Sequence, residues 1–352
     1  MEKAKKAKEK VMTILVSRTD AIGDVMLTLP LCGLLKQYFP SSQILFIGRT
    51  YTAPIIACCA HVDGFINVDE LSLLGDVEAG KKLATFQADV ILHVFPNRSV
   101  AKWAKLAKIN LRIGTTNRLF HWGTVNRFVP LSRKKSTLHE AQLNCKLLAP
   151  LGGLLHNKGL ANVPSRETLA TLSGFHQLPA CPENLMQLVN EGNGKTVVLH
   201  PLSNQSAREW GLAHYGVLIE LLFAQGFRLF ITGTVTEGER MGKWLDGFVE
   251  KGMVTNLTGK LSLTELIGFL RFTAFFVSAS TGPLHIAAAT GVHAIGIFPP
   301  MRPIHPGRWQ PIGENVKVFC LAKACTDCRK STSCPCMTAI QPAEVAAWIC
   351  KQ

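Results

Sequence analysis

Short apolar runs alternate with amphipathic segments along most of this chain. Near its start, an apolar run at residues 11–16 is followed by a polar loop, by a helical pattern from Asp24 to Phe39, and by a second apolar run at residues 43–48. Such runs are typical of strands buried on both faces of a sheet, and the leucines between them recur at helical spacing. This order predicts a strand, a helix and a second, parallel strand.

The same order recurs at the head of the second half of the chain. An apolar run at residues 196–200 precedes a polar loop, a helical pattern at 212–224 and a further apolar run at 227–232. The alternation continues elsewhere. Further strands are predicted at residues 65–68, 88–94, 253–257, 274–278 and 293–298, and further helices at 100–108, 139–151, 238–251 and 263–271.

We therefore predict an α/β protein of two domains, each a doubly wound parallel sheet with helices on both faces. Residues 1–10 form a lysine-rich arm, residues 11–175 the first domain and residues 176–352 the second, with the polar stretch at 152–194 joining them. Two such domains leave a central cleft at the carboxyl ends of their strands, which is where ligands bind in open α/β sheets.

Composition narrows the class of protein. The chain has 352 residues, of which 47% are hydrophobic, and this is enough to bury two cores. The apolar run after the basic start is too short for a signal peptide, and no stretch approaches the ~20 apolar residues of a spanning helix. We therefore predict a cytoplasmic protein. The sequence has no GxxxxGK motif followed by Ser or Thr and no GxGxxG, which argues against P-loop ATPases and ordinary dinucleotide dehydrogenases.

Positive charge is concentrated in one segment. The formal net charge is +14, and residues 98–135 hold ten Lys or Arg without one Asp or Glu. This pattern indicates an anionic partner, which could be a nucleic acid, a phosphorylated substrate or an anionic membrane surface, although a solvated basic face is an alternative. The segment lacks the regular aromatic interleaving of single-strand nucleic-acid binders, so a nucleic-acid partner is not predicted.

Five of the eleven cysteines cluster near the C-terminus, at Cys320, Cys325, Cys328, Cys334 and Cys336. In a cytosolic chain such a cluster suggests a metal before a disulfide. A structural zinc ion held by the last four is one hypothesis, although their spacing is not that of a standard zinc ribbon.

The stretch from Phe275 to Gly291 changes character twice. An apolar run gives way to a Ser, Thr and Gly turn at residues 278–282, and Pro283 then opens an alanine-rich helical pattern. A strand, a tight turn and a helix in this order leave backbone N–H groups at the helix N-terminus, which is an arrangement that binds phosphate. An ordinary capped helix is the alternative.

Four segments together resemble the bacterial heptosyltransferase family, whose members have the GT-B fold of two Rossmann-like domains facing a central cleft. They are SRTDAIGDVMLTLP (17–30), HEAQLNCKLLAPLG (139–152), HPLSNQSAREWGLAHY (200–215) and ASTGPLHIAAATGVHAIGIFPP (279–300). The resemblance runs from about residue 11 to the end. It implies an inverting transfer of a sugar, in the family heptose from ADP-heptose, onto the inner core of lipopolysaccharide at the inner face of the cytoplasmic membrane.

The resemblance assigns catalytic roles to two residues. Asp24, in the IGDV segment, matches the family's catalytic base, and a carboxylate at the mouth of the cleft could accept the acceptor hydroxyl's proton; capping its own helix is the alternative role. Arg208 lies where the family carries a basic residue, usually Lys, before a Trp. Its guanidinium could grip two oxygens of the departing diphosphate, or it could pair with Glu209.

The donor contacts are expected in the second domain. Ser203 lies where a hydroxyl contacting the donor is expected, and Thr281 and Gly282 would offer hydroxyl and N–H groups to the diphosphate. His285, one turn later, could contact phosphate or sugar, or could be a packed core residue. Glu237 could hold ribose hydroxyls, or could be a first-turn acid beside a capping box formed by residues 236 and 239.

The chain departs from the family at Ser280, where many members have Asp. This change removes a charge from the donor site and leaves the identity of the sugar open. The loop at residues 299–309 is also more basic than usual. Both features suggest a separate branch of the family.

The basic segment is expected to bind the acceptor through Lys102, Lys105, Lys108 and Arg112. The predicted partners are thus a nucleotide sugar, a phosphorylated glycolipid of the lipid A and inner-core type, and an anionic membrane surface. No cofactor is predicted beyond the ADP-sugar substrate, and no metal ion is needed, because no DxD-type acidic pair occurs in the donor loops. The alternatives are a protein that binds sugar nucleotides without turnover, and a transferase that uses a different nucleotide sugar.

Overall fold

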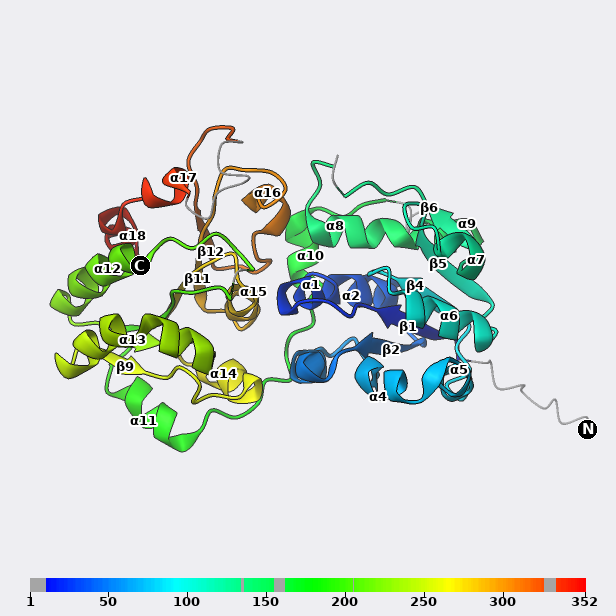
Figure 1. The fold of residues 1–352 in the computed structure, drawn as a ribbon, viewed down its shortest axis with the longest axis horizontal. Helices are drawn as coiled ribbons and strands as arrows, with labels where there is room; N and C mark the ends of the chain where they lie inside the picture. The colour runs from blue at the N-terminus through cyan, green and yellow to red at the C-terminus, as the bar shows by residue number, and fades with distance from the viewer. Residues whose placement is uncertain (1–10, 134–135, 155–161, 205, 326–333) are drawn as a thin grey trace, which may run out of the picture.

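The computed structural model describes residues 11–133, 136–154, 162–204, 206–325 and 334–352. Two six-stranded sheets stand side by side, each covered by helices, and every strand pair in them is parallel (Figure 1). The predicted pair of doubly wound α/β domains is therefore confirmed. The lysine-rich arm at residues 1–10 lies outside the described residues.

The first sheet has the strand order β3-β2-β1-β4-β5-β6. Its strands are β1 (Thr13–Ser17), β2 (Gln43–Gly48), β3 (Gly64–Asn67), β4 (Val90–His93), β5 (Leu111–Thr115) and β6 (Arg127–Val129). Its helices and 3-10 turns are α1 (Ile22–Met26), α2 (Leu29–Tyr38), η1 (Thr50–Thr52), α3 (Ala53–Ala57), α4 (Val68–Leu73), α5 (Gly75–Ala84), α6 (Arg98–Leu106), α7 (His121–Thr124), α8 (Glu140–Cys145), η2 (Lys146–Leu148), α9 (Ala149–Leu154) and α10 (Arg166–Thr171).

The second sheet has the order β12-β11-β10-β7-β8-β9, which read from its other edge is the order of the first. Its strands are β7 (Thr196–His200), β8 (Arg228–Ile231), β9 (Val254–Asn256), β10 (Phe275–Ala279), β11 (His293–Ile297) and β12 (Val316–Phe319). Its helices are α11 (Glu183–Asn190), α12 (Leu212–Ala224), α13 (Val235–Glu250), α14 (Leu263–Leu270), α15 (Gly282–Ala289), α16 (Pro306–Trp309), α17 (Pro335–Thr338) and α18 (Pro342–Ile349).

The central strands explain why the apolar runs were informative. All five residues of β1 are buried, and so are all five of β7 and of β10. A strand covered by helices on both faces needs apolar residues at nearly every position, so it reads as a continuous run rather than an alternation. In each sheet the order reverses beside the first strand, and this switch point is where the site described below is built.

Several boundaries differ from the predicted ones. The helix expected from Asp24 to Phe39 is two helices, because Pro30 cannot donate the N–H that would continue the first, and Asp24 lies inside α1 rather than at its start. The expected helix at 139–151 is divided into α8, η2 and α9. The polar stretch at 152–194 contains α10 and α11, and Phe175 still pairs with Cys59 of the first domain in an isolated bridge.

Within the described residues, none of the helices combines the length and the apolar character that crossing a bilayer requires.

Candidate active site

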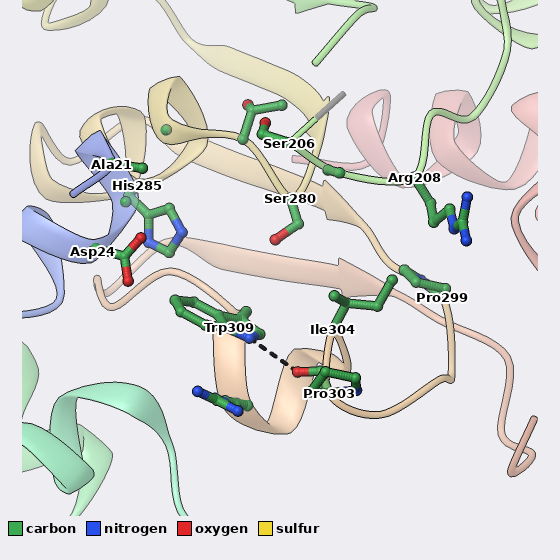
Figure 2. A pocket seen from close by; sticks show the side chains of 15 residues that line it. Ala21, Asp24, Ser206, Arg208, Ser280, His285, Pro299, Pro303, Ile304 and Trp309 are labelled. Atoms are coloured by element: carbon green, nitrogen blue, oxygen red, sulfur yellow. Dashed lines mark hydrogen bonds between the residues drawn. The ribbon is translucent and has the colours of Figure 1, made fainter. Parts of the chain in front are cut away.

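A pocket of about 320 Å³ opens between the carboxyl edges of the two sheets (Figure 2). The first domain contributes the start of α1, and the second contributes three loops. The lining residues are Ala21, Gly23, Asp24, Ser206, Ala207, Arg208, Ser280, Thr281, Gly282, His285, Pro299, Pro303, Ile304, Arg308 and Trp309. Of the predicted catalytic and donor residues, the fold therefore gathers Asp24, Arg208, Ser280, Thr281, Gly282 and His285 around one space.

Two glycines allow the helices α1 and α15 to meet at this pocket. A Cβ atom at Gly282 would lie 2.7 Å from Cβ of Ile22, and one at Gly23 would lie 2.9 Å from Cδ2 of His285. Real Cβ atoms do not come this close to other carbon atoms, so a side chain at Gly282 would push the two helices apart and one at Gly23 would displace the His285 ring. The N-terminal ends of α1 and α15 are therefore in contact at the pocket, and this places Asp24 beside the second domain.

Asp24 projects from the first turn of α1 into the pocket (Figure 2). The helix cap is Ala21, without a side-chain bond, and one Oδ atom of Asp24 accepts a hydrogen bond from Nη2 of Arg18. Burial raises the pKa of the Asp24 carboxyl to about 6, with Asp20 and Glu140 adding to the rise and Arg18 opposing it. A carboxylate with this pKa is ionised at neutral pH and basic enough to take a proton from a hydroxyl as that hydroxyl reacts.

The N-terminus of α15 forms the part of the pocket wall next to α1. Thr281 is the cap residue, but its side chain makes no capping bond, and no acidic residue lies in the first turn. Its hydroxyl is bonded to that of Ser278 at 3.0 Å and its N–H donates to the Ala279 carbonyl at 2.7 Å. The hydroxyl and the N–H group that Thr281 was expected to offer to the diphosphate are therefore already engaged in hydrogen bonds inside the protein. The first-turn N–H groups of the helix, beginning with Gly282, have no acceptor within the helix and are better placed to meet an anion.

His285 is a buried imidazole in the pocket wall beside Asp24 (Figure 2). Burial lowers the pKa of His285 to about 3, with His139 contributing, so the ring is neutral. Its Nδ1 is buried and has no hydrogen-bond partner among the residues that the structure describes. Ring nitrogens of His93 and His121, which do not line this pocket, are buried without a partner in the same way, so a contact of His285 with phosphate or sugar stays a prediction.

The loop between β7 and α12 supplies Arg208 and is braced from behind by Ser203. The Ser203 hydroxyl lies 3.1 Å from both the Ala207 carbonyl and Oε1 of Glu209 and can donate its proton to either, and Ser203 is not among the residues lining the pocket. Glu209 also pairs with Arg240 at 3.6 Å. In Figure 2 the guanidinium of Arg208 lies on the side of the pocket away from Asp24. A donor contact by Ser203 stays a prediction, while Ser206 and Ala207 line the pocket.

Glu237 is buried in the cap of α13. Its Oε2 accepts from the Thr234 N–H at 2.8 Å and from the Thr234 hydroxyl at 3.1 Å, and it lies 4.0 Å from Nε2 of His200. The capping box is therefore formed by residues 234 and 237, and the one predicted at residues 236 and 239 was wrong. Glu237 does not line the pocket of Asp24, so its contact with a ribose stays a prediction.

Three of the four predicted acceptor residues line a second hollow, of about 780 Å³, which is formed by residues of α5, α6 and α7. Lys102, Lys105 and Lys108 line it, although α6 ends at Leu106 and Lys108 follows it with a φ of 56°. Lys102 pairs with Asp76. Arg112 instead donates from Nε to the Thr124 carbonyl at 2.7 Å, which ties β5 to α7. None of these residues lines the pocket of Asp24.

Comparison with known proteins identifies the family. The model of glycosyltransferase family 9 (heptosyltransferase) matches residues 77–337. The chain belongs to glycosyltransferase family 9. It is therefore a glycosyltransferase, and its two facing sheets are the GT-B fold.

Individual relatives of this glycosyltransferase cover most of it. Lipopolysaccharide heptosyltransferase 3 of Escherichia coli is 24% identical over 317 residues, which span 84% of this chain and 85% of that protein. The solved structure of E. coli ADP-heptose lps heptosyltransferase II superposes with a TM-score of 0.74 at 18% identity, covering 97% and 99% of the two chains. E. coli heptosyltransferase WaaC with ADP gives a TM-score of 0.68 at 19% identity over the same shares.

Three residues that the structure places at or behind the pocket were not singled out from the sequence of this glycosyltransferase: Arg18, Glu140 and Arg308. Arg18 bonds Asp24 directly, Glu140 accepts from Arg18, and Arg308 reaches Glu140 from the second domain. The first two lie inside the segments that carry the family resemblance, and the third lies in the unusually basic loop at 299–309. Their positions in those segments could have marked these three residues as candidates. The sequence could not show that the three side chains contact one another.

The described part of the chain shows no arrangement of side chains that supports the zinc hypothesis. Cys325, Cys334 and Cys336 are buried, and no group of three or more potential ligands among the described residues is arranged to hold a metal ion. Cys328, the fourth proposed ligand, lies outside the described residues.

Proposed function

We propose that this glycosyltransferase moves a sugar, heptose in our first choice, from an ADP-sugar to an anionic glycolipid acceptor of the lipopolysaccharide inner core, with inversion at the anomeric carbon. The observation that carries the proposal is the presence, in one pocket, of the ionised Asp24 carboxylate and the uncapped N-terminus of α15. The names of the relatives, which are heptosyltransferases acting on lipopolysaccharide, support the choice of substrates.

The proposed reaction needs one base and one anion cradle. An acceptor hydroxyl gives its proton to an Oδ atom of Asp24 while its oxygen forms the new bond to the anomeric carbon. The bond between that carbon and the diphosphate oxygen breaks on the opposite side, so the configuration inverts. The electron pair leaves on the diphosphate, where the first-turn N–H groups of α15 and the guanidinium of Arg208 stabilise the charge.

We propose that no metal ion takes part, because the donor loops contain no DxD-type pair and Arg208 with a helix N-terminus can neutralise a diphosphate. Activity is expected to survive EDTA. The measurement is the transfer rate of enzyme stripped of metal, with and without added Mg²⁺ or Mn²⁺. Stimulation by either ion would contradict the proposal.

We further propose that the enzyme works at the inner face of the cytoplasmic membrane, held there by the basic surface around α6 and α7. The exposed cations there are Arg98, Lys102, Lys105, Lys108, Arg118 and Arg127. Apolar side chains stand among them, with Leu119 91% and Trp122 64% exposed. Cations mixed with an exposed Trp and Leu suit the headgroup region of an anionic bilayer, and phosphates of the acceptor would be drawn to the same surface.

The function is tested by offering the purified protein ADP-heptose, ADP-glucose and UDP-glucose with an inner-core acceptor that lacks heptose. We expect ADP release and transfer with ADP-heptose, and a product anomer opposite to that of the donor. Thermal stabilisation by ADP-sugars without transfer would instead support the non-catalytic alternative, and transfer only from another donor would support a different nucleotide sugar.

A further inference from the structure

A single buried guanidinium connects the proposed base to a set of charged side chains behind it. Arg18 is 3% exposed, and it donates from Nη2 to Asp24, from Nε to Oδ1 of Asp20 at 2.6 Å, and from Nη1 to Oε1 of Glu140 at 3.3 Å. Its Nη1 also lies 3.4 Å from Oδ1 of Asn144. The orientation of Arg18 is thus fixed on three edges, and the Nη2 edge is the one that meets the base.

Glu140 is the centre of this set. It is completely buried at the start of α8, and besides Arg18 it accepts from Nε of Arg133 at 2.7 Å and from Nε and Nη2 of Arg308 at 3.1 and 3.0 Å. Burial alone would raise the pKa of Glu140, but Arg133, Arg18 and Arg308 outweigh it and the pKa is lowered. A buried carboxylate paired with three cations keeps its charge, and it holds those cations in fixed positions.

One of the three cations crosses the seam between the domains. Arg308 lies on α16 of the second domain, where it also lines the pocket of Asp24. Its Nη1 donates to the Arg133 carbonyl at 3.1 Å, and nearby the Nε2 atom of His139 lies 2.8 Å from the Gln310 carbonyl. The set of charges behind Asp24 is therefore complete only when the two domains are docked.

We propose that Glu140 is a positioning residue that holds Arg18 against the catalytic base, and that Arg308 makes this arrangement depend on the docking of the two domains. The inference rests on the proposed role of Asp24. Glu140 touches neither the pocket nor a substrate position, so it acts through Arg18. The negative charge of Glu140 sustains the basicity of Asp24, and the positive charges of Arg133 and Arg308 restrain it.

The charged and titratable groups around Asp24 come from both domains. They are Arg18, Asp20, Tyr51 and Glu140 from the first domain, and Arg208, His285 and Arg308 from the second. Removing one anion from this set should make ionised Asp24 easier to maintain, and removing one cation should make it harder. The two kinds of variant should therefore move the pH dependence of catalysis in opposite directions, which a general loss of packing would not do.

The test is the pH profile of kcat/KM, measured with one donor and one acceptor so that their own titrations cancel between variants. The wild-type rate should fall below about pH 6, where Asp24 becomes protonated. We call this fall at low pH the acid limb of the profile. In Glu140→Gln the acid limb should move to lower pH by roughly one unit, whereas in Arg308→Gln it should move to higher pH. Arg228→Gln, which removes a cation of the second domain that pairs with Glu191 and does not line the pocket of Asp24, is the matched control and should leave the limb in place.

Glu140→Gln leaves the buried Arg18 and the partly buried Arg133 and Arg308 with one anion fewer and could prevent folding, so Arg133→Gln provides a second route. Arg133 is 21% exposed in its side chain and does not line the pocket of Asp24, and its loss should move the limb up by less than the loss of Arg308. An unmoved limb in the folded variants, or a shift in the same direction for anion and cation variants, would overturn the proposal. If Asp24→Asn kept full turnover, the proposed function itself would fail instead.

Discussion

The two halves of this glycosyltransferase share one topology and present charge in different ways. Both sheets have the same strand order, and both build the pocket at the edge where that order reverses. In the first half the working groups are side chains in a buried ionic set, ending in the carboxylate of Asp24. In the second half they are a helix N-terminus without a side-chain cap and the neutral ring of His285.

This difference shows that the fold supplies a position and the residues at the sheet edge supply the chemistry. A group that must accept a proton needs a charge of its own, and its pKa has to be held near neutrality by burial and neighbours. A group that must receive a diphosphate needs donors that are already oriented and carry no counter-charge. The comparison therefore predicts that the first half governs turnover and the second half governs donor binding.

The largest expected effect comes from removing the charge in the first half. Asp24→Asn should lower kcat by roughly 10²–10⁴-fold, because a general base contributes about that much, while leaving KM for the donor nearly unchanged. The control is Asp63→Asn, the same change at a carboxylate that pairs with Lys36 elsewhere in the first domain. Turnover within tenfold of wild type would end the assignment of Asp24 as base.

The matching change in the second half removes a cation from the anion cradle. Arg208→Gln should lower kcat/KM on the order of 10²-fold and should raise the donor KM, because the guanidinium is proposed to meet both the bound and the departing diphosphate. Arg228→Gln, which removes a cation paired with Glu191 away from the pocket, is the control. A normal donor KM with reduced kcat would place Arg208 in the chemistry alone and weaken the division between the halves.

A smaller effect is expected at the basic surface of the first half. Reversing Lys102, Lys105 and Lys108 to Glu should raise the acceptor KM by about tenfold at low salt and spare the donor KM, with the difference shrinking as salt screens the charges. The control reverses three exposed lysines of the second half, at residues 243, 251 and 260. Equal damage to donor and acceptor kinetics would mean that α6 has a structural role only.

The smallest effect concerns the specificity of the second half. Ser280 lies in the pocket with a neutral hydroxyl, at a position where the family resemblance implies an Asp. Losing one charge-assisted hydrogen bond should cost about 1–2 kcal/mol of discrimination between sugar epimers. This discrimination is measured by comparing kcat/KM for several ADP-sugars in the wild type and in Ser280→Asp. Strong discrimination in the wild type that the variant leaves unaltered would remove Ser280 as the determinant.

The buried strands and the site motifs could be read from the sequence because their signals are local. The bounds predicted for β2, β7 and α12 agree with the structure, since each is an apolar segment bounded by polar residues. Three strands were missed. Strand β5 contains Arg112 and Gly114, and its first two residues are only partly buried. The edge strand β6 has three residues, and all four residues of the edge strand β12 are only partly buried, so none of the three has a continuous apolar run.

Two other features could not be predicted, because the sequence leaves the exact position of a capping box open and does not show contacts between residues far apart in the chain. The segment TVTEGE contains two overlapping Thr-x-x-Glu patterns, and only packing decides that residues 234 and 237 form the capping box. Glu140 and Arg308 are separated by 168 positions, and their contact depends on how the two domains dock. No local pattern carries that information, so the sequence could place Asp24 in the cleft but could not place the charges behind it.

The division of labour between the halves is tested most directly by binding without chemistry. Calorimetric titration with ADP compares the wild type, Asp24→Asn and Arg208→Gln in the same buffer. We predict that Asp24→Asn binds ADP within about threefold of the wild type, whereas Arg208→Gln binds it at least tenfold more weakly. Similar losses in the two variants, or a loss in Asp24→Asn alone, would contradict the claim that the first half acts on the proton and the second half holds the donor.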